Sequence, residues 1–278
     1  MVTVGRVPVG GTELVYDHRG AGPLLVLVHG TGTPASAWAG AVGDLAAGGY
    51  RVIAYDRRGY GRSTHPPVCD YRVHVADLAT LVQHLGTPAH LVGWSSGGSV
   101  ALALAAQHPQ LCRSVVVIEA TWHGLRYATS DLVSAYARLK FLQLRGRRRE
   151  AAAVFFRWVS GLRDGRTGFD ALPTADQQTL LANGEIVLTE TDPHLFGPLM
   201  EHVSTKRLAV VQAPITWLLG SETRTGLFGR LRAQAVRVAP NIQSGLIMGA
   251  GHFAHRDAPR QFATSVLRAV TSIHNRNQ

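Results

Sequence analysis

Residues 91–106, LVGWSSGGSVALALAA, place two serines and two glycines between two apolar runs. The first run, Leu91 to Trp94, has the length of a buried strand, and the alanine-rich run after Gly98 is typical of a buried helix. Small residues at such a junction allow a turn that larger side chains would block. The stretch is therefore either a tight packing turn or a turn that presents one serine for chemistry.

The segment GWSSG, residues 93–97, fits the pattern G-x-S-x-G with Ser95 at its centre. This pattern requires a strand before it and a helix after it, and both are predicted here. Gly93 and Gly97 would avoid clashes between strand and helix, while a strained turn would raise the Ser95 hydroxyl above the sheet. The Ser96 N–H, in the first turn of the helix, would then face a developing oxyanion.

Apolar runs without polar alternation recur along the chain, as is typical of parallel strands covered on both faces. They lie at 24–29, 51–55, 91–94, 115–119, 215–220 and 245–248. Helical patterns separate them, at 35–47, 71–85, 96–108 and 259–270. An antiparallel pair, 2–7 and 12–18, is expected at the sheet edge. The alternation predicts an α/β protein with a mostly parallel, doubly wound sheet.

Residues 122–205 break this rhythm, because they contain several helical patterns and no convincing strand. We expect a helical cap (lid) insertion over the carboxyl ends of the strands. The core domain would then comprise residues 1–121 and 206–278.

Three further motifs follow predicted strands. His29-Gly30-Thr31-Gly32 ends one strand, residues 56–63 read DRRGYGRS, and His252 stands in GAGHFAH before the last helix. Together with GWSSG, they resemble the motifs of the α/β-hydrolase superfamily, over essentially the whole chain. The resemblance implies the α/β-hydrolase fold, with Ser95 as nucleophile and His252 as its base.

The same resemblance assigns supporting roles to the neighbouring residues. The backbone N–H groups of Thr31 and Ser96 are expected to form the oxyanion hole. His29 is expected to serve the oxyanion turn through hydrogen bonds, and Asp56 to tie loops together.

The acid that would orient His252 departs from the usual pattern of the family. Most members carry an Asp three residues past a strand-ending glycine, but here Thr223 stands at that distance from Gly220, and Glu222 is one step early. Glu119 ends the run 115–119, where a buried carboxylate needs a partner. Zearalenone-lactonase-like members resemble this chain in carrying their acid there and in having a second serine after the nucleophile. We predict Glu119 as the acid, with Glu222 as the alternative.

These residues predict a serine hydrolase that cleaves a carboxylic ester or lactone of a moderately bulky apolar substrate through an acyl-enzyme. The alternatives are an acyltransferase or thioesterase, a C–C bond hydrolase with the same triad, and a non-hydrolytic ligand receptor on this fold. A serine nucleophile argues against members that attack with an aspartate, such as haloalkane dehalogenases and epoxide hydrolases. Trp94, Trp122 and Phe253 are the expected substrate contacts.

The composition, 46% hydrophobic and 17% charged, is that of a globular protein. No membrane span is expected, since no run reaches about 18 apolar residues. The net charge of +10 gathers partly in an arginine-rich region, but no nucleic-acid motif accompanies it, so nucleic acid is not an expected partner. Cys69 and Cys112 make no disulfide framework, which favours a cytoplasmic location. We expect no cofactor and no metal, and leave a homodimer open.

Overall fold

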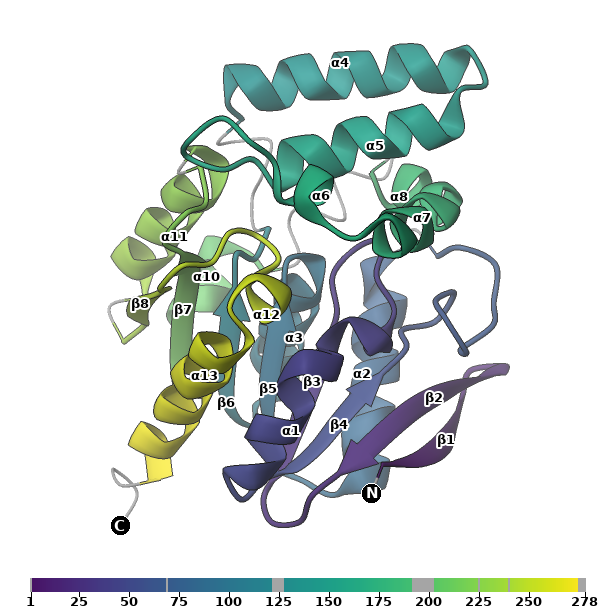
Figure 1. The fold of residues 1–278 in the computed structure, drawn as a ribbon. Helices are drawn as coiled ribbons and strands as arrows, with labels where there is room; N and C mark the ends of the chain where they lie inside the picture. Colours follow the sequence, from purple (N-terminus) through teal and green to yellow (C-terminus); the bar gives the residue numbers. More distant parts are fainter. Residues whose placement is uncertain are drawn as a thin grey trace.

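The computed structural model describes residues 2–68, 70–121, 128–191, 203–224, 226–239 and 241–274. Its centre is an eight-stranded sheet in the order β1-β2-β4-β3-β5-β6-β7-β8 (Figure 1). β1 (Thr3–Val9) and β2 (Thr12–Arg19) form an antiparallel hairpin at one edge, and β2 pairs antiparallel with β4. The other strands pair in parallel: β3 (Leu24–Val28), β4 (Arg51–Tyr55), β5 (Ala89–Trp94), β6 (Cys112–Ile118), β7 (Ile215–Gly220) and β8 (Gln243–Ile247).

The register of the central strands brings distant parts of the sequence to one edge. Val28 pairs with Gly93, Trp94 pairs with Ile118, and Ile118 pairs with Leu218. The residues that directly follow β3, β5 and β6 therefore meet at the carboxyl edge of the sheet, where ligand sites of open α/β sheets form.

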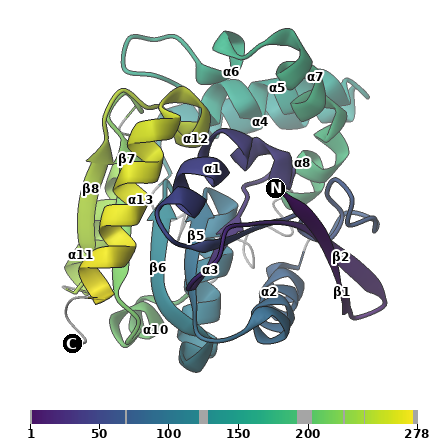
Figure 2. The same cartoon turned by 60° about the horizontal axis from the view of Figure 1, so that its bottom comes forward.

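Helices cover both faces of the sheet (Figures 1 and 2). One face carries η1 (Ala35–Trp38), α1 (Ala39–Ala47), α12 (Ala254–Asp257) and α13 (Pro259–His274). The other carries α2 (Tyr71–Leu85), α3 (Ser96–Gln107), η2 (Pro109–Leu111), α10 (Thr205–Ala209) and α11 (Gly226–Val238). This is the doubly wound arrangement that the alternating sequence pattern predicted.

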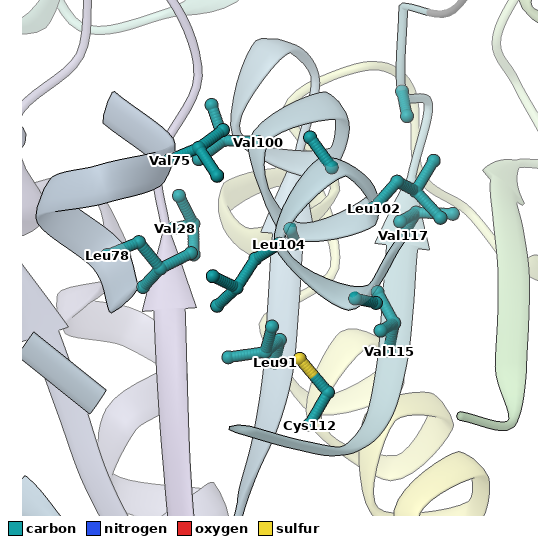
Figure 3. Close-up of a cluster of buried hydrophobic side chains, with 14 of the residues drawn as sticks. Val28, Val75, Leu78, Leu91, Val100, Leu102, Leu104, Cys112, Val115 and Val117 are labelled. Atoms are coloured by element: carbon teal, nitrogen blue, oxygen red, sulfur yellow. The ribbon is translucent and has the colours of Figure 1, made fainter. Parts of the chain in front are cut away.

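The two faces form separate hydrophobic cores because successive side chains of a strand point to opposite sides. On β3, Val26 and Val28 join the core under α2 and α3, whereas Leu25 and Leu27 join the core under α1 and α13. Figure 3 shows the first core, in which Val28 faces Val75 of α2. Each fully buried Leu or Val contributes roughly 1.5–3 kcal/mol, so these strands are held firmly below the site.

A third group of helices, here called the helical layer, lies over the carboxyl ends of the strands (Figure 1). It consists of α4 (Ser130–Leu144), α5 (Arg148–Val159), α6 (Gly168–Ala171), α7 (Thr174–Ala182) and α8 (Gly184–Glu190). Phe156 and Val187 of this layer join the core under α1 and α13. The layer is thus packed onto the sheet rather than suspended above it.

The predicted fold class is confirmed, and the helices of the core that the sequence analysis did not expect include the long α11 and the short η2, α10 and α12. Helix α11 directly precedes β8, and it buries Leu227, Phe228, Leu231 and Ala235 on one side. Its many arginines and its two glycines obscured that spacing. No helix within the described ranges has the length and apolarity needed to cross a membrane.

Candidate active site

Ser95 occupies a strained bend between β5 and α3. Its φ of 54° and ψ of −125° lie in a region that L-residues rarely adopt. The bend is held by hydrogen bonds of 2.9 Å from the Ser95 N–H to the Ile118 carbonyl and from the Gly98 N–H to the Ser95 carbonyl. A Cβ on Gly97 would lie 2.2 Å from the Val28 carbonyl oxygen, so only glycine allows this approach.

The turn after β3 lies directly beside this bend, since a Cβ on Gly30 would lie 3.0 Å from that of Ser95. The Gly30 carbonyl accepts hydrogen bonds from His29 Nδ1 at 2.9 Å and Thr33 Oγ1 at 3.1 Å. In a trans peptide the N–H points opposite to the carbonyl, so these bonds also set the direction of the Thr31 N–H.

The His29 ring is itself fixed on both sides. The Arg57 N–H donates to His29 Nε2 at 2.9 Å, which assigns the ring proton to Nδ1. Burial, and then the nearby charge of Arg57, lower the pKa of His29 well below its usual value. His29 is therefore a neutral donor to the Gly30 carbonyl, in line with the supporting role expected for it.

Asp56 ties two loops together. Its Oδ1 accepts from the Ala35 N–H at 2.7 Å, and its Oδ2 accepts from Arg62 Nε at 2.8 Å. Its contacts are with the loop framework, as expected from the sequence.

The structure brings Glu119 to His252. Glu119 follows β6 with a φ of 48°, is fully buried, and its Oε2 lies 2.7 Å from His252 Nδ1. The other carboxylate oxygen accepts from the Gly220 N–H at 2.9 Å and from the Thr223 hydroxyl. A buried carboxylate with this many donors is well compensated. Thr223, at the place where most of the family carries its acid, is thus a donor to Glu119.

Glu222 lies away from the imidazole. Its side chain is exposed, and its Oε1 accepts from the Ser221 hydroxyl at 2.8 Å. Of the two candidate acids, Glu119 therefore contacts His252 and Glu222 contacts Ser221, because the strand end that carries Glu119 faces the His252 ring.

Aromatic rings enclose His252. Phe228 stacks on the imidazole with ring centres 4.9 Å apart, and the Trp94 Nε1–H donates to the His252 carbonyl at 2.7 Å. The ring and the Ser95 hydroxyl, both described, are not joined by a hydrogen bond in this structure. Such contacts are often long in unliganded enzymes and tighten when substrate binds.

The structure places two of the three expected substrate contacts in the hydrophobic core. Trp94 and Phe253 are each 2% exposed and belong to the core under α1 and α13, where they pack around the His252 loop. Trp94 belongs to β5 and Phe253 directly precedes α12, and a contact of either ring with substrate stays a prediction. Trp122 lies outside the described residues.

Sequence reasoning missed a buried charged pair on the opposite side of Ser95. Arg57 Nη1 lies 3.3 Å from Oε1 of Glu190, the last residue of α8, and both side chains are almost fully buried. Burial raises the pKa of Glu190, but the charge of Arg57, together with His74 and the Thr31 hydroxyl, outweighs burial and holds the pKa well below its usual range. Thr31 Oγ1 lies 2.6 Å from Glu190 Oε2. No spacing rule connects residues 159 positions apart, so no sequence signal could have found this contact.

Comparisons with known proteins show the family of this chain. A family model for the α/β-hydrolase fold matches residues 23–156. The pimeloyl-[acyl-carrier protein] methyl ester esterase of Xanthomonas campestris pv. campestris is 31% identical over 270 residues, which cover 92% of this chain and 98% of the relative. The chain belongs to the α/β-hydrolase superfamily.

Two further comparisons differ in how much of the chain they cover and in identity. A putative non-heme chloroperoxidase of Synechocystis sp. is 42% identical over 98 residues, so the match covers 34% of this chain and 36% of that relative. The bromoperoxidase structure from Bacillus anthracis superposes with a TM-score of 0.77, covering 98% of this α/β-hydrolase and 100% of that chain at 21% identity. At that identity the likeness shows the shared fold alone.

Proposed function

We propose that this α/β-hydrolase is a serine hydrolase that cleaves a carboxylic ester through an acyl-enzyme, with Ser95, His252 and Glu119 as its triad. The observation that carries the proposal is the buried 2.7 Å contact between Glu119 and His252. The loop of His252 is hydrogen-bonded to Trp94, the last residue of the strand that leads into Ser95. A strained serine, a neighbouring turn with an oriented N–H, and a paired imidazole form the parts of nucleophilic acyl transfer.

Each residue has one role in the proposed reaction. Ser95 Oγ attacks the ester carbonyl while His252 Nε2 takes the hydroxyl proton, and the resulting oxyanion accepts from the N–H groups of Thr31 and Ser96. Glu119 holds the proton on Nδ1 and stabilises the imidazolium. His252 then protonates the leaving alkoxide, removes a proton from water, and so releases the acid and restores Ser95.

An ester is the preferred substrate class, and the name of the 31% identical relative, a methyl ester esterase, supports it. A lactone is the same chemical group closed into a ring, and it stays an alternative on the strength of the Ser95-Ser96 and Glu119 motifs. We propose that residues 122–205 act as a cap over this site, because the helical layer lies above the carboxyl ends of β3, β5 and β6 (Figure 1).

The test is a panel of p-nitrophenyl esters and lactones assayed with the wild-type protein and with Ser95→Ala. Turnover should fall at least about 10³-fold in the variant, since the nucleophile is lost. Intact mass spectrometry of the wild type with a slowly deacylating ester should show the acyl group on Ser95. Turnover that survives in Ser95→Ala, or activity on no ester or lactone, would refute the proposal.

A further inference from the structure

Four side chains form an unbroken polar chain around the proposed oxyanion hole. Arg57 Nη2 lies 3.3 Å from Ser96 Oγ, which lies 2.9 Å from Thr31 Oγ1. Thr31 Oγ1 in turn lies 2.6 Å from Glu190 Oε2. Glu190 closes the chain through its ion pair with Arg57, at 3.3 Å.

Counting hydrogens gives this chain a direction. The Thr31 hydroxyl has one hydrogen and cannot donate to both Glu190 and Ser96. A carboxylate is the stronger acceptor, and the 2.6 Å distance is typical of a charge-assisted bond, so the hydrogen belongs to Glu190. Ser96 Oγ accepts from Arg57 Nη2, and toward Thr31 it is again placed as an acceptor, so this contact is the weaker of the two that the Thr31 hydroxyl makes. The donors of the chain are therefore Arg57 and Thr31, its acceptors are Ser96 and Glu190, and the two charged ends neutralise each other.

We infer that Glu190 is a positioning residue of the oxyanion hole, acting through a hydrogen-bonded ring of Glu190, Arg57, Ser96 and Thr31. The two middle members are the residues whose backbone N–H groups would hold the oxyanion, so this inference rests on the proposed function. The ring fixes Thr31 and Ser96 relative to each other, although they come from different strand ends. Cooperative, low-dielectric bonds of this kind hold a geometry firmly.

Helix α8 holds the same turn at a second point, which is independent of the ring. The Asn183 side chain, just before α8, donates to the Gly32 carbonyl at 2.8 Å. A Cβ on Gly32 would lie 2.5 Å from the Phe156 ring and 3.0 Å from a Val187 methyl. The helical layer therefore sits directly on the oxyanion turn, and it supplies Glu190 from a fixed position.

The test compares two ring variants, Glu190→Gln and Thr31→Val, with the matched control Glu185→Gln. Thr31→Val removes the hydroxyl but keeps the backbone N–H of residue 31. Glu185 is an exposed carboxylate of the same helix that pairs with Arg148. We expect kcat for the best ester to fall roughly 10–100-fold in both ring variants, with KM within about twofold, because a displaced N–H weakens binding of the oxyanion more than of the substrate. The control should keep wild-type kcat.

Two further measurements separate positioning from general damage. Affinity for a trifluoromethyl ketone, which forms an oxyanion on the serine, should fall by the same factor as kcat. The double variant Glu190→Gln/Thr31→Val should lose no more kcat than the more damaged of the two single variants, because both substitutions break the same ring. Additive losses, or an unchanged inhibitor affinity, would overturn the inference.

If Glu190→Gln fails to fold, Thr31→Val still tests the ring, because that variant keeps the buried ion pair between Arg57 and Glu190. A folded Thr31→Val with kcat within twofold of wild type would then overturn the ring. If Ser95→Ala abolishes turnover while both ring variants remain fully active, only the ring is wrong. If Ser95→Ala remains active, the proposed function itself is wrong.

Discussion

Glu119 shows how one backbone angle can relocate a functional group. Its φ of 48° is unfavourable for a non-glycine residue. In this conformation, however, its carboxylate accepts hydrogen bonds from the Gly220 N–H and the Thr223 hydroxyl and contacts His252. These bonds offset the strain and the cost of burying a charge. The site can therefore keep a paired imidazole although the usual acid position holds a threonine.

Exchanging each candidate carboxylate for its amide tests this assignment. Glu119→Gln should lower kcat on the order of 10³–10⁴-fold, because a neutral amide no longer stabilises the imidazolium or enforces the tautomer at Nδ1. Glu222→Gln is the matched control and should stay within twofold, since its side chain is exposed and bonded to Ser221. Steady-state kinetics on one ester decides between them. The reverse ranking would make Glu222 the acid.

The bend between β5 and α3 depends on backbone contact between two elements. The helix begins so close to β3 that a Cβ on Gly97 would meet the carbonyl oxygens of Val28 and His29 at 2.2 and 2.5 Å. Val28 pairs with Tyr55 on one side and Gly93 on the other, so its carbonyl cannot move without disturbing the parallel pairing of β3. The glycine is thus required by packing, and the strained backbone of Ser95 follows from the short turn that the glycine allows.

Gly97→Ala should therefore lower the free energy of unfolding by at least about 2 kcal/mol, the range for forcing atoms into a packed site. Gly40→Ala is the matched control, because Gly40 is exposed in α1 and its added Cβ would meet only ordinary contacts at 3.6 Å. That change should raise stability by roughly 0.5–1 kcal/mol, the usual gain from replacing a helical glycine. Urea unfolding measures both values. Equal midpoints for the two variants would contradict the packing argument.

At the scale of the whole molecule, His29, His74 and His255 stand out among the described residues as buried histidines whose pKa is lowered, whereas the unfolded chain would protonate them in mild acid. Burial lowers the pKa of His29 and His74, and lowers the pKa of His255 to about 3. His255 lies between Trp38, Trp94 and Phe262, and neither ring nitrogen has a hydrogen-bond partner among the described residues. Burying such a neutral ring does not lower the free energy of unfolding while the same histidine is also neutral in the unfolded chain, that is, above about pH 6.5.

Stability should consequently fall as the pH drops below about 6.5, because the unfolded state then binds protons that the folded state refuses. The slope for each such histidine is on the order of 1 kcal/mol per pH unit. For His255 this loss should continue down to its folded pKa of about 3. Urea unfolding between pH 7.5 and 5 measures the slope. His255→Phe keeps the aromatic packing and should reduce the slope of unfolding free energy against pH by the contribution of about one proton. An unchanged slope would contradict the assignment.

The amino-acid sequence was sufficient for the strand order along the chain, the Ser95 bend and the supporting roles of His29 and Asp56. Those features depend on apolar runs and on glycines a few residues apart, which act locally. Helix α11 escaped prediction because arginines and glycines interrupt its apolar spacing. The core positions of Trp94 and Phe253 were not predictable, because an aromatic residue beside a functional one reads the same in the sequence whether it faces substrate or core.

Contacts between distant segments were settled only by the folded arrangement. Glu119 and His252 lie 133 residues apart, and Thr31 and Glu190 lie 159 apart. No local pattern records which of two carboxylates reaches an imidazole, or that a helix end above the sheet contacts an oxyanion turn. Parallel strand register and the seating of α8 on Gly32 make those choices, because only three-dimensional packing determines which chain segments share the same space.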